Sequence, residues 1–223
     1  MFATPEAATR YAELVARADT AGVVVHSVTA SVMTELAQTV TPQGLIGVAK
    51  FRDTSLADLT AGGPCLVVVL AAVRDPGNAG TILRTADAAG ADAVVFTDTS
   101  VDPYNPKCVR SSAGSLFHMP FVVGPDIEVA LRALRECGLR VLATSGAGRV
   151  DLYSTALSGP VAWVFGNEAW GLPKELVALA DESVRVPIHG RAESLNLATA
   201  AAVCLYASVQ SQRAVGGCKG GGS

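Results

Sequence analysis

Residues 65–84 read CLVVVLAAVRDPGNAGTILR, and no other stretch of the chain is as diagnostic of its architecture. The opening apolar run is uninterrupted, which is typical of a strand buried on both faces of a parallel sheet. Pro76-Gly77 then predicts a tight turn, and Asn78 is a residue type that begins helices. The pattern from about Ala79 to Ala89 predicts a helix, which Gly90 ends. A buried strand followed at once by a helix is the repeating unit of an α/β fold.

The same alternation continues toward the C-terminus. Further strands are expected at the apolar runs 93–97, 121–123, 140–144, 161–165 and 183–187. Helices are expected at 106–112, 126–137, 173–180 and 194–212. Because the strands are continuous Val, Ile and Leu runs, the sequence predicts an α/β domain whose mostly parallel sheet is covered on both faces.

The chain is expected to divide into four segments. Residues 1–52 should form a short α/β domain, with helices near 4–19 and 29–38 and strands near 22–27 and 44–51. Residues 53–63 end in Ala-Gly-Gly-Pro and are expected to be a linker. The main domain should span 64–213, and the glycine-rich residues 214–223 should form a disordered tail.

The composition excludes several classes of protein. Half of the residues are hydrophobic and 17% are charged, unlike a disordered chain. No apolar run approaches the ~20 residues of a membrane span, and no signal peptide pattern precedes one. A net charge of −3 argues against non-specific polyanion binding and leaves room for a local basic patch. Five scattered cysteines favour reduced thiols over disulfides or a metal site, and we expect a cytoplasmic location.

Three polar clusters directly follow predicted strands. They read RDPGNAGTILRTA at 74–86, VFGNEAWGLP at 164–173 and VPIHGRAESLNLATA at 186–200. Ligands of open α/β sheets bind beyond the carboxyl ends of the strands, so this placement indicates a shared site. Each cluster alone also fits an ordinary turn or a capped helix. It is the order and spacing of the three clusters together that indicate a functional site.

In this order the motifs N-x-G-x-x-x-R-T-A, F-G-N-E-x-x-G-L and V-P-x-x-G-x-x-x-S-L-N resemble the SpoU (TrmH) family of SPOUT-class RNA methyltransferases. The resemblance covers about residues 64–212 and shows no departure at the core motif positions. Residues 105–118 also look like the helix that follows the second strand in this family.

The resemblance implies the SPOUT fold, with a deep trefoil knot in the C-terminal part of the sheet, and an obligate homodimer. It also implies that S-adenosylmethionine is the methyl donor and that a ribose 2′-hydroxyl in RNA is the acceptor. Residues 1–52 look like part of the L30e-like RNA-binding domain that many members carry, with the first strand and helix missing. Since the minimal tRNA enzymes of the family lack that domain, 23S ribosomal RNA is the expected substrate.

The resemblance also assigns roles to single residues. Arg84 is the implied catalytic arginine, Asn78 and Glu168 order the site, and Ser194 and Asn196 complete it. Because a guanidinium stays protonated, we expect Arg84 to grip a phosphate and stabilise charge on the 2′ oxygen rather than act as a free base.

Two further sets of residues complete the expected site. The cofactor is expected at Thr144, Ser145, Gly146, Phe165, Gly166, Asn167, Val186, Ile188, Leu195 and Asn196. The basic rim for RNA is expected to comprise Arg74, Arg84, Lys107, Arg110 and Arg191. Trp163 is expected in the core and Trp170 at the cofactor site or a dimer face.

Other functions remain open at this point. A dinucleotide-dependent oxidoreductase is disfavoured, because the first strand is followed by Pro-Gly-Asn-Ala-Gly rather than by G-x-G-x-x-G. A catalytically silent RNA-binding module of the same fold is a better alternative, although Arg84, Glu168, Ser194 and Asn196 argue for an enzyme. A tRNA 2′-O-methyltransferase is the alternative that keeps the chemistry and changes the substrate.

Overall fold

The computed structural model describes residues 1–37, 39 and 41–216. The chain divides into two compact units, Met1–Phe51 and Arg52–Ser223. Within the described residues, no helix is both long enough and apolar enough to cross a membrane. Of the described cysteines, Cys108, Cys137 and Cys204 are free thiols. The expectation of reduced thiols is wrong for Cys65, which is disulfide-bonded.

The first unit is built from short elements around a small core. Its sheet has the order β2-β1-β3, in which β1 pairs parallel with β2 and antiparallel with β3. The strands are β1 (Phe2–Ala3), β2 (His26–Ser27) and β3 (Leu45–Ile46). The helices are α1 (Pro5–Arg10), α2 (Ala12–Thr20) and α3 (Ala30–Ala37). The strands are shorter than predicted because little apolar surface is buried here: the buried hydrophobic residues described in this unit are Ala3, Ala7 and Met33.

The second unit contains the predicted parallel sheet. Its strand order is β6-β5-β4-β9-β7-β10-β8, and all the pairs between these strands are parallel. The strands are β4 (Leu66–Leu70), β5 (Ala93–Phe96), β6 (Phe121–Val123), β7 (Arg140–Thr144), β8 (Val150–Asp151), β9 (Val161–Phe165) and β10 (Glu182–Arg185). The order places β9 between β4 and β7, so the carboxyl ends of strands distant in sequence meet at one edge.

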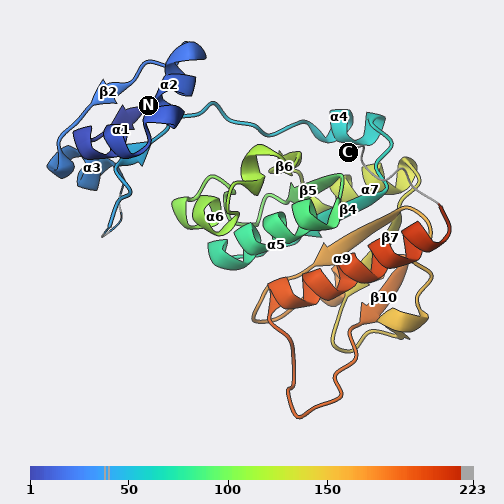
Figure 1. The fold of residues 1–223 in the computed structure, drawn as a ribbon. Coiled ribbons are helices and arrows are strands. Elements are labelled where there is room, and N and C mark those ends of the chain that lie inside the picture. The colour runs from blue at the N-terminus through green and yellow to red at the C-terminus, as the bar shows by residue number, and fades with distance from the viewer. Residues whose placement is uncertain (38, 40, 217–223) are drawn as a thin grey trace. The chain divides into compact units, whose positions relative to one another are not determined.

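Helices cover both faces of this sheet, as expected for continuous apolar strands. They are α4 (Leu56–Ala61), α5 (Pro76–Ala89), α6 (Pro106–Ser111), α7 (Ile127–Glu136), α8 (Lys174–Ala178) and α9 (Leu197–Ala214), with the 3₁₀ turns η1 (Ser115–Phe117) and η2 (Leu152–Ser154). Helices α5, α6 and α9 pack on one face, and α4, α7 and α8 pack on the other. In Figure 1, α5 (green) and α9 (red) lie side by side.

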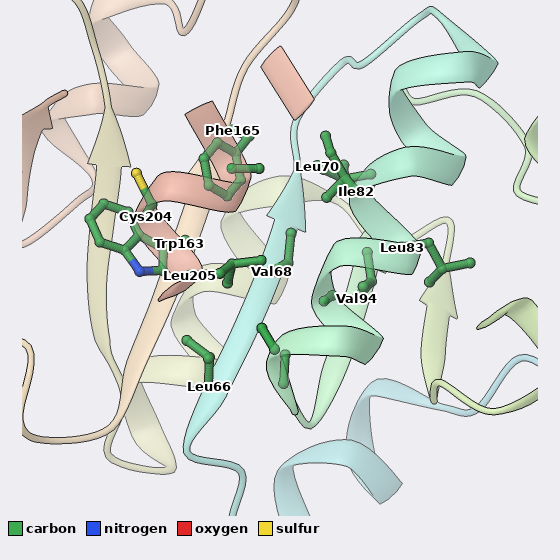
Figure 2. Packing of buried hydrophobic residues seen from close by; sticks show 14 of the residues in the cluster. Leu66, Val68, Leu70, Ile82, Leu83, Val94, Trp163, Phe165, Cys204 and Leu205 are labelled. Carbon is green, nitrogen blue, oxygen red and sulfur yellow. The ribbon is translucent and has the colours of Figure 1, made fainter. Parts of the chain in front are cut away.

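Strand β4 shows how the two faces share one strand. Leu66, Val68 and Leu70 pack in the cluster under α5 and α9, whereas Val67 and Val69 pack in the cluster on the opposite face. Figure 2 shows the first cluster, with the side chains of β4 and β9 facing those of α5 and α9. Every residue of β4 is at most 2% exposed, which explains why both faces of the strand are apolar.

The prediction of a linker at 53–63 is wrong. These residues contain helix α4 and belong to the second unit. The Ser55 side chain caps this helix by accepting a hydrogen bond from the Asp58 backbone, and Leu59 is buried. Ser55-x-x-Asp58 is a pattern that begins helices, but the glycines at 62 and 63 led to the prediction of a linker. At the other end α9 reaches Ala214, one residue into the expected tail, and residues 217–223 lie outside the described residues.

Candidate active site

The first polar cluster forms the junction between β4 and α5. Asp75, rather than Asn78, caps α5: its carboxylate accepts hydrogen bonds from the backbone of Gly77 (3.1 Å) and of Asn78 (3.3 Å). The helix therefore begins at Pro76, three residues earlier than predicted, with proline at the first position, where no hydrogen-bond donor is needed. Because Asp75 is the cap, the side chain of Asn78 is free to make other contacts.

The second cluster is a tight loop after β9. Asn167 and Gly171 exchange two backbone hydrogen bonds of 3.0 and 2.8 Å, which closes the loop. The amide of Asn167, 5% exposed, donates to the Ala72 carbonyl (2.8 Å) and accepts from the Ala169 backbone (2.8 Å). A Cβ at Gly166 would collide with the backbone of Gly171, so glycine is required there. The loop is thus fixed at both of its ends.

The third cluster leads into α9. Asn196 caps this helix, since its side-chain oxygen accepts hydrogen bonds from the backbone of Ala198 (2.9 Å) and of Thr199 (3.3 Å). The helix consequently starts at Leu197, three residues after the predicted start at Ser194. Ser194 lies in the exposed segment before the cap.

Hydrogen bonds of Asn78 join the three clusters. Its amide nitrogen donates to Glu168 Oε1 (3.3 Å), and its amide oxygen accepts from Asn196 Nδ2 (3.0 Å). Glu168 also accepts from the backbone N–H groups of Arg74 (3.2 Å) and Asp75 (3.1 Å). Residues 90 and 118 positions apart therefore meet in one hydrogen-bonded group at the carboxyl end of the sheet.

A pocket of about 360 Å³ lies beside this group. Eight of the ten residues expected at the cofactor line it: Thr144, Ser145, Gly146, Gly166, Asn167, Val186, Ile188 and Leu195. Of the other two, Phe165 is fully buried in the core, and Asn196 makes the bond to Asn78 described above. Glu168 and Ser194 line the pocket too, whereas Arg84, Asn78 and Asn196 do not.

The pocket is acidic and offers free backbone donors. Its charged lining residues are Glu168 and Glu193, and no Lys, Arg or His lines it. Within the described part of the chain, the backbone N–H groups of Gly146, Ile188 and Leu195 make no hydrogen bond. A ligand with a cationic centre and a hydrogen-bonding heterocycle fits such a lining. Among the described residues, no cluster of His, Cys, Asp and Glu is arranged to hold a metal ion.

The expected basic residues lie outside the pocket. Arg74, Arg84, Arg110 and Arg191 are exposed, and none of the described acidic groups forms an ion pair with them. Lys107 instead pairs with Asp75, at 2.6 Å between Nζ and Oδ1. The hydrogen bond from Lys107 is the main cause that lowers the pKa of the Asp75 carboxyl below its usual value.

Asp75 is the functional residue that the sequence interpretation missed. It caps α5, carries the ion pair with Lys107 and gives its backbone N–H to Glu168. Asp followed by Pro is the expected pattern for a helix cap and first helical position, so the signal was present in the sequence. Glu193 was not singled out either, and no motif position marked it.

Comparisons with known proteins identify the family to which this chain is related. The pattern of the SpoU rRNA Methylase family matches residues 65–206. The Bacillus subtilis 23S rRNA (guanosine(2553)-2′-O)-methyltransferase RlmP is 36% identical over 185 residues, which cover 83% of this chain and 72% of RlmP. RlmB of Bordetella pertussis, a 23S rRNA (guanosine-2′-O-)-methyltransferase, is 32% identical over 202 residues, or 88% of this chain and 82% of RlmB.

Solved structures show the same relationship. The AdoMet-bound rRNA methyltransferase from Sinorhizobium meliloti superposes with a TM-score of 0.82 at 35% identity, and the match covers 94% of this chain and 79% of that one. The SpoU methyltransferase AviRb from Streptomyces viridochromogenes gives a TM-score of 0.80 at 26% identity, over 96% of this chain and 82% of AviRb. On its motifs, its fold and these matches, the chain belongs to the SpoU rRNA methylase family.

Proposed function

We propose that this protein methylates a ribose 2′-hydroxyl of 23S ribosomal RNA, with S-adenosylmethionine as the methyl donor. The observation that carries the proposal is the hydrogen-bonded group Asn78–Glu168–Asn196, which joins the three family motifs beside the pocket. The names of RlmP and RlmB support the substrate, and their matches cover 83% and 88% of this chain. A tRNA 2-OH methylation enzyme of known structure also matches, over 69% of this chain, and supports the alternative substrate less.

The pocket suits the proposed cofactor. When bound, S-adenosylmethionine supplies a methyl group activated by a sulfonium centre. Glu168 and Glu193 supply negative charge for a cationic ligand, and the free N–H groups of Gly146, Ile188 and Leu195 supply donors for an adenosine edge. AdoMet bound in the structures from Sinorhizobium meliloti and of AviRb supports this assignment.

Orientation is the main contribution of the hydrogen-bonded group. Glu168 fixes the first turn after β4 through two backbone N–H groups, and Asn78 ties that turn to the start of α9. A ribose hydroxyl held in this frame would face the pocket with little freedom to turn away. Alignment of two reacting groups can supply on the order of 7–11 kcal/mol of the barrier.

Arg84 is proposed to bind the phosphate next to the target ribose and to stabilise charge that develops on the 2′ oxygen. Its planar guanidinium suits bidentate binding of a phosphate. Arg84 lies about 9 Å along the axis of α5 from Asn78, six residues at 1.5 Å each, and it is exposed without an ion pair to any described residue. Because Arg84 lies outside the pocket of its own chain, we also propose that the active form is a homodimer.

Three further assignments rest on the resemblance to the family. The first unit is proposed to be an L30e-like RNA-binding domain, supported by a structural match that covers 94% of the chain and so extends beyond the second unit. The loops after β7, β9 and β10 are proposed to form the trefoil knot, supported by the insertion of β9 between β4 and β7. A cytoplasmic location is proposed because ribosomal RNA is the substrate.

The proposal is tested by transfer of a labelled methyl group from S-adenosylmethionine to total bacterial RNA, followed by size fractionation. Label in 23S rRNA is the expected result. Label confined to tRNA would keep the chemistry and refute the proposed substrate. If the protein binds S-adenosylmethionine and labels no RNA, it is a silent binding module and the proposed activity is wrong.

A further inference from the structure

Trp170 is a large, exposed aromatic side chain on the rim of the pocket. It lines the pocket and is 63% exposed. Within the described part of the chain its ring makes no hydrogen bond and no aromatic contact. Trp163, by contrast, is fully buried, and its indole N–H donates to Ser208 Oγ at 2.8 Å. The contrast shows that Trp170 is not needed for the core.

The backbone around Trp170 holds this exposed ring in place. The loop is closed by the two backbone hydrogen bonds between Asn167 and Gly171, and Gly171 has a φ of +69°, which favours glycine. Asn167 is itself fixed to the Ala72 carbonyl. An apolar side chain on a closed, well-anchored loop is presented to solvent by the fold rather than by a mobile segment.

The position of the loop relates Trp170 to the reacting group. Glu168, two residues earlier in the same closed loop, bonds to Asn78 in the group proposed to orient the ribose. Ser194 and Leu195 line the same pocket from the third motif. A nucleotide whose 2′-hydroxyl is held near Glu168 and Ser194 would therefore have its base within reach of the indole.

We propose that Trp170 stacks on the base of the target nucleotide, an inference that rests on the proposed function. Proteins that recognise unpaired RNA bases stack them on aromatic side chains. Stacking tolerates any base, because every base has a π face, so Trp170 contributes affinity and placement rather than base identity.

The test compares Trp170→Ala and Trp170→Phe with the wild-type chain, using in vitro transcribed 23S rRNA. We expect the alanine variant to raise the KM for RNA by at least about fivefold, the lower range for loss of one stacked base. The phenylalanine variant should fall between alanine and wild type. The melting temperature should not change, and the rise in the KM for RNA should exceed any rise in the KM for S-adenosylmethionine. Tyr153→Ala is the matched control, because Tyr153 is an exposed aromatic (70%) that does not line this pocket.

An unchanged KM for RNA in Trp170→Ala would overturn the proposal. A loss confined to the KM for S-adenosylmethionine would place the indole on the cofactor, and dissociation of the oligomer would place it in a subunit interface. Either result contradicts base stacking.

Fluorescence separates this proposal from the proposed function, because it needs no methyl transfer. The chain has two tryptophans, so Trp170→Phe leaves the buried Trp163 as the sole indole emitter. RNA alone should quench the emission of the wild-type chain and leave that of Trp170→Phe unchanged. Equal quenching in both would refute stacking. Quenching of the wild type alone, without methyl transfer, would support stacking and refute the activity.

Discussion

Replacing Asn78 by aspartate tests the hydrogen-bonded group with the smallest change of shape. Asn78→Asp keeps the oxygen that accepts from Asn196 and removes the amide nitrogen that donates to Glu168. Two carboxylates would then meet where the nitrogen and oxygen now lie 3.3 Å apart. Because Glu168 is exposed, an effective dielectric constant of about 40–80 applies, and the repulsion is about 1–2.5 kcal/mol.

The lost hydrogen bond adds about 1 kcal/mol, so the orienting group would be weakened by roughly 2–4 kcal/mol in total. If this loss falls on the transition state, kcat/KM for methyl transfer at pH 8 drops roughly 30- to 1,000-fold. The repulsion also raises the pKa of the introduced carboxyl group, since a like charge disfavours ionisation. A proton taken up at lower pH would restore a donor toward Glu168, and the deficit relative to wild type should shrink as the pH falls from 8 toward 5.5.

The assay is the pH profile of kcat/KM for Asn78→Asp divided by that of the wild-type chain. Asn105→Asp is the matched control, because Asn105 caps α6 by accepting from the Lys107 backbone (2.9 Å), and aspartate caps equally well. The control should keep wild-type activity throughout. A kcat/KM of Asn78→Asp equal to that of the wild type at pH 8, or a loss of kcat/KM that does not change with pH, would refute the role given to this hydrogen bond.

Three further predictions concern the arginine, a helix contact and an ion pair. Arg84→Lys should be nearly as inactive in methyl transfer as Arg84→Ala, because lysine lacks the planar fork, and near-normal turnover of the lysine variant would contradict the phosphate-binding role. Gly80→Ala should clearly lower the melting temperature, because a Cβ at Gly80 would collide with the backbone of α6. Gly159→Ala should leave the melting temperature unchanged, because a Cβ there meets open space. Equal melting temperatures of the two variants would show that α6 can move aside. Lys107→Met should destabilise the fold at pH 7 by at most about 1 kcal/mol in urea unfolding, the range of an exposed ion pair. Because the pKa of Asp75 is lowered from its usual value of 3.8, the ion pair stabilises the fold at pH values above 3.8, and this stabilisation is lost as the pH falls below 3.8. The difference in stability between Lys107→Met and the wild type should therefore vanish in acid. A difference that persists in acid would show that it comes from packing of the lysine stem.

The strands of the second unit could be predicted because a strand buried on both faces consists of consecutive apolar residues. The runs at 121–123, 140–144 and 161–165 coincide with β6, β7 and β9. The first unit was harder to predict because its elements are short and bury little apolar surface. Strand β1 has two residues, Phe2–Ala3, and leaves no periodic pattern to detect.

The site shows where sequence patterns stop being informative. Motif spacing identified Asn78, Glu168 and Asn196, and the family resemblance gave their roles. Their mutual hydrogen bonds depend on β9 lying next to β4, a non-sequential pairing that no local pattern encodes. Asn78 was predicted as a possible helix cap, and the structure shows Asp75 in that place. The cap therefore decides which side chain is left for chemistry.

Methylation of the ribose 2′ oxygen can be measured by alkaline hydrolysis of 23S rRNA that the wild-type chain has labelled with S-adenosylmethionine carrying a radioactive methyl group. A methyl group on a 2′ oxygen blocks cleavage of the adjacent phosphodiester, because that oxygen can no longer attack the phosphorus. For a 2′-O-methyltransferase, the label should be recovered in an alkali-resistant dinucleotide. Label recovered in mononucleotides would show methylation of a base, and would contradict a 2′-O-methyltransferase.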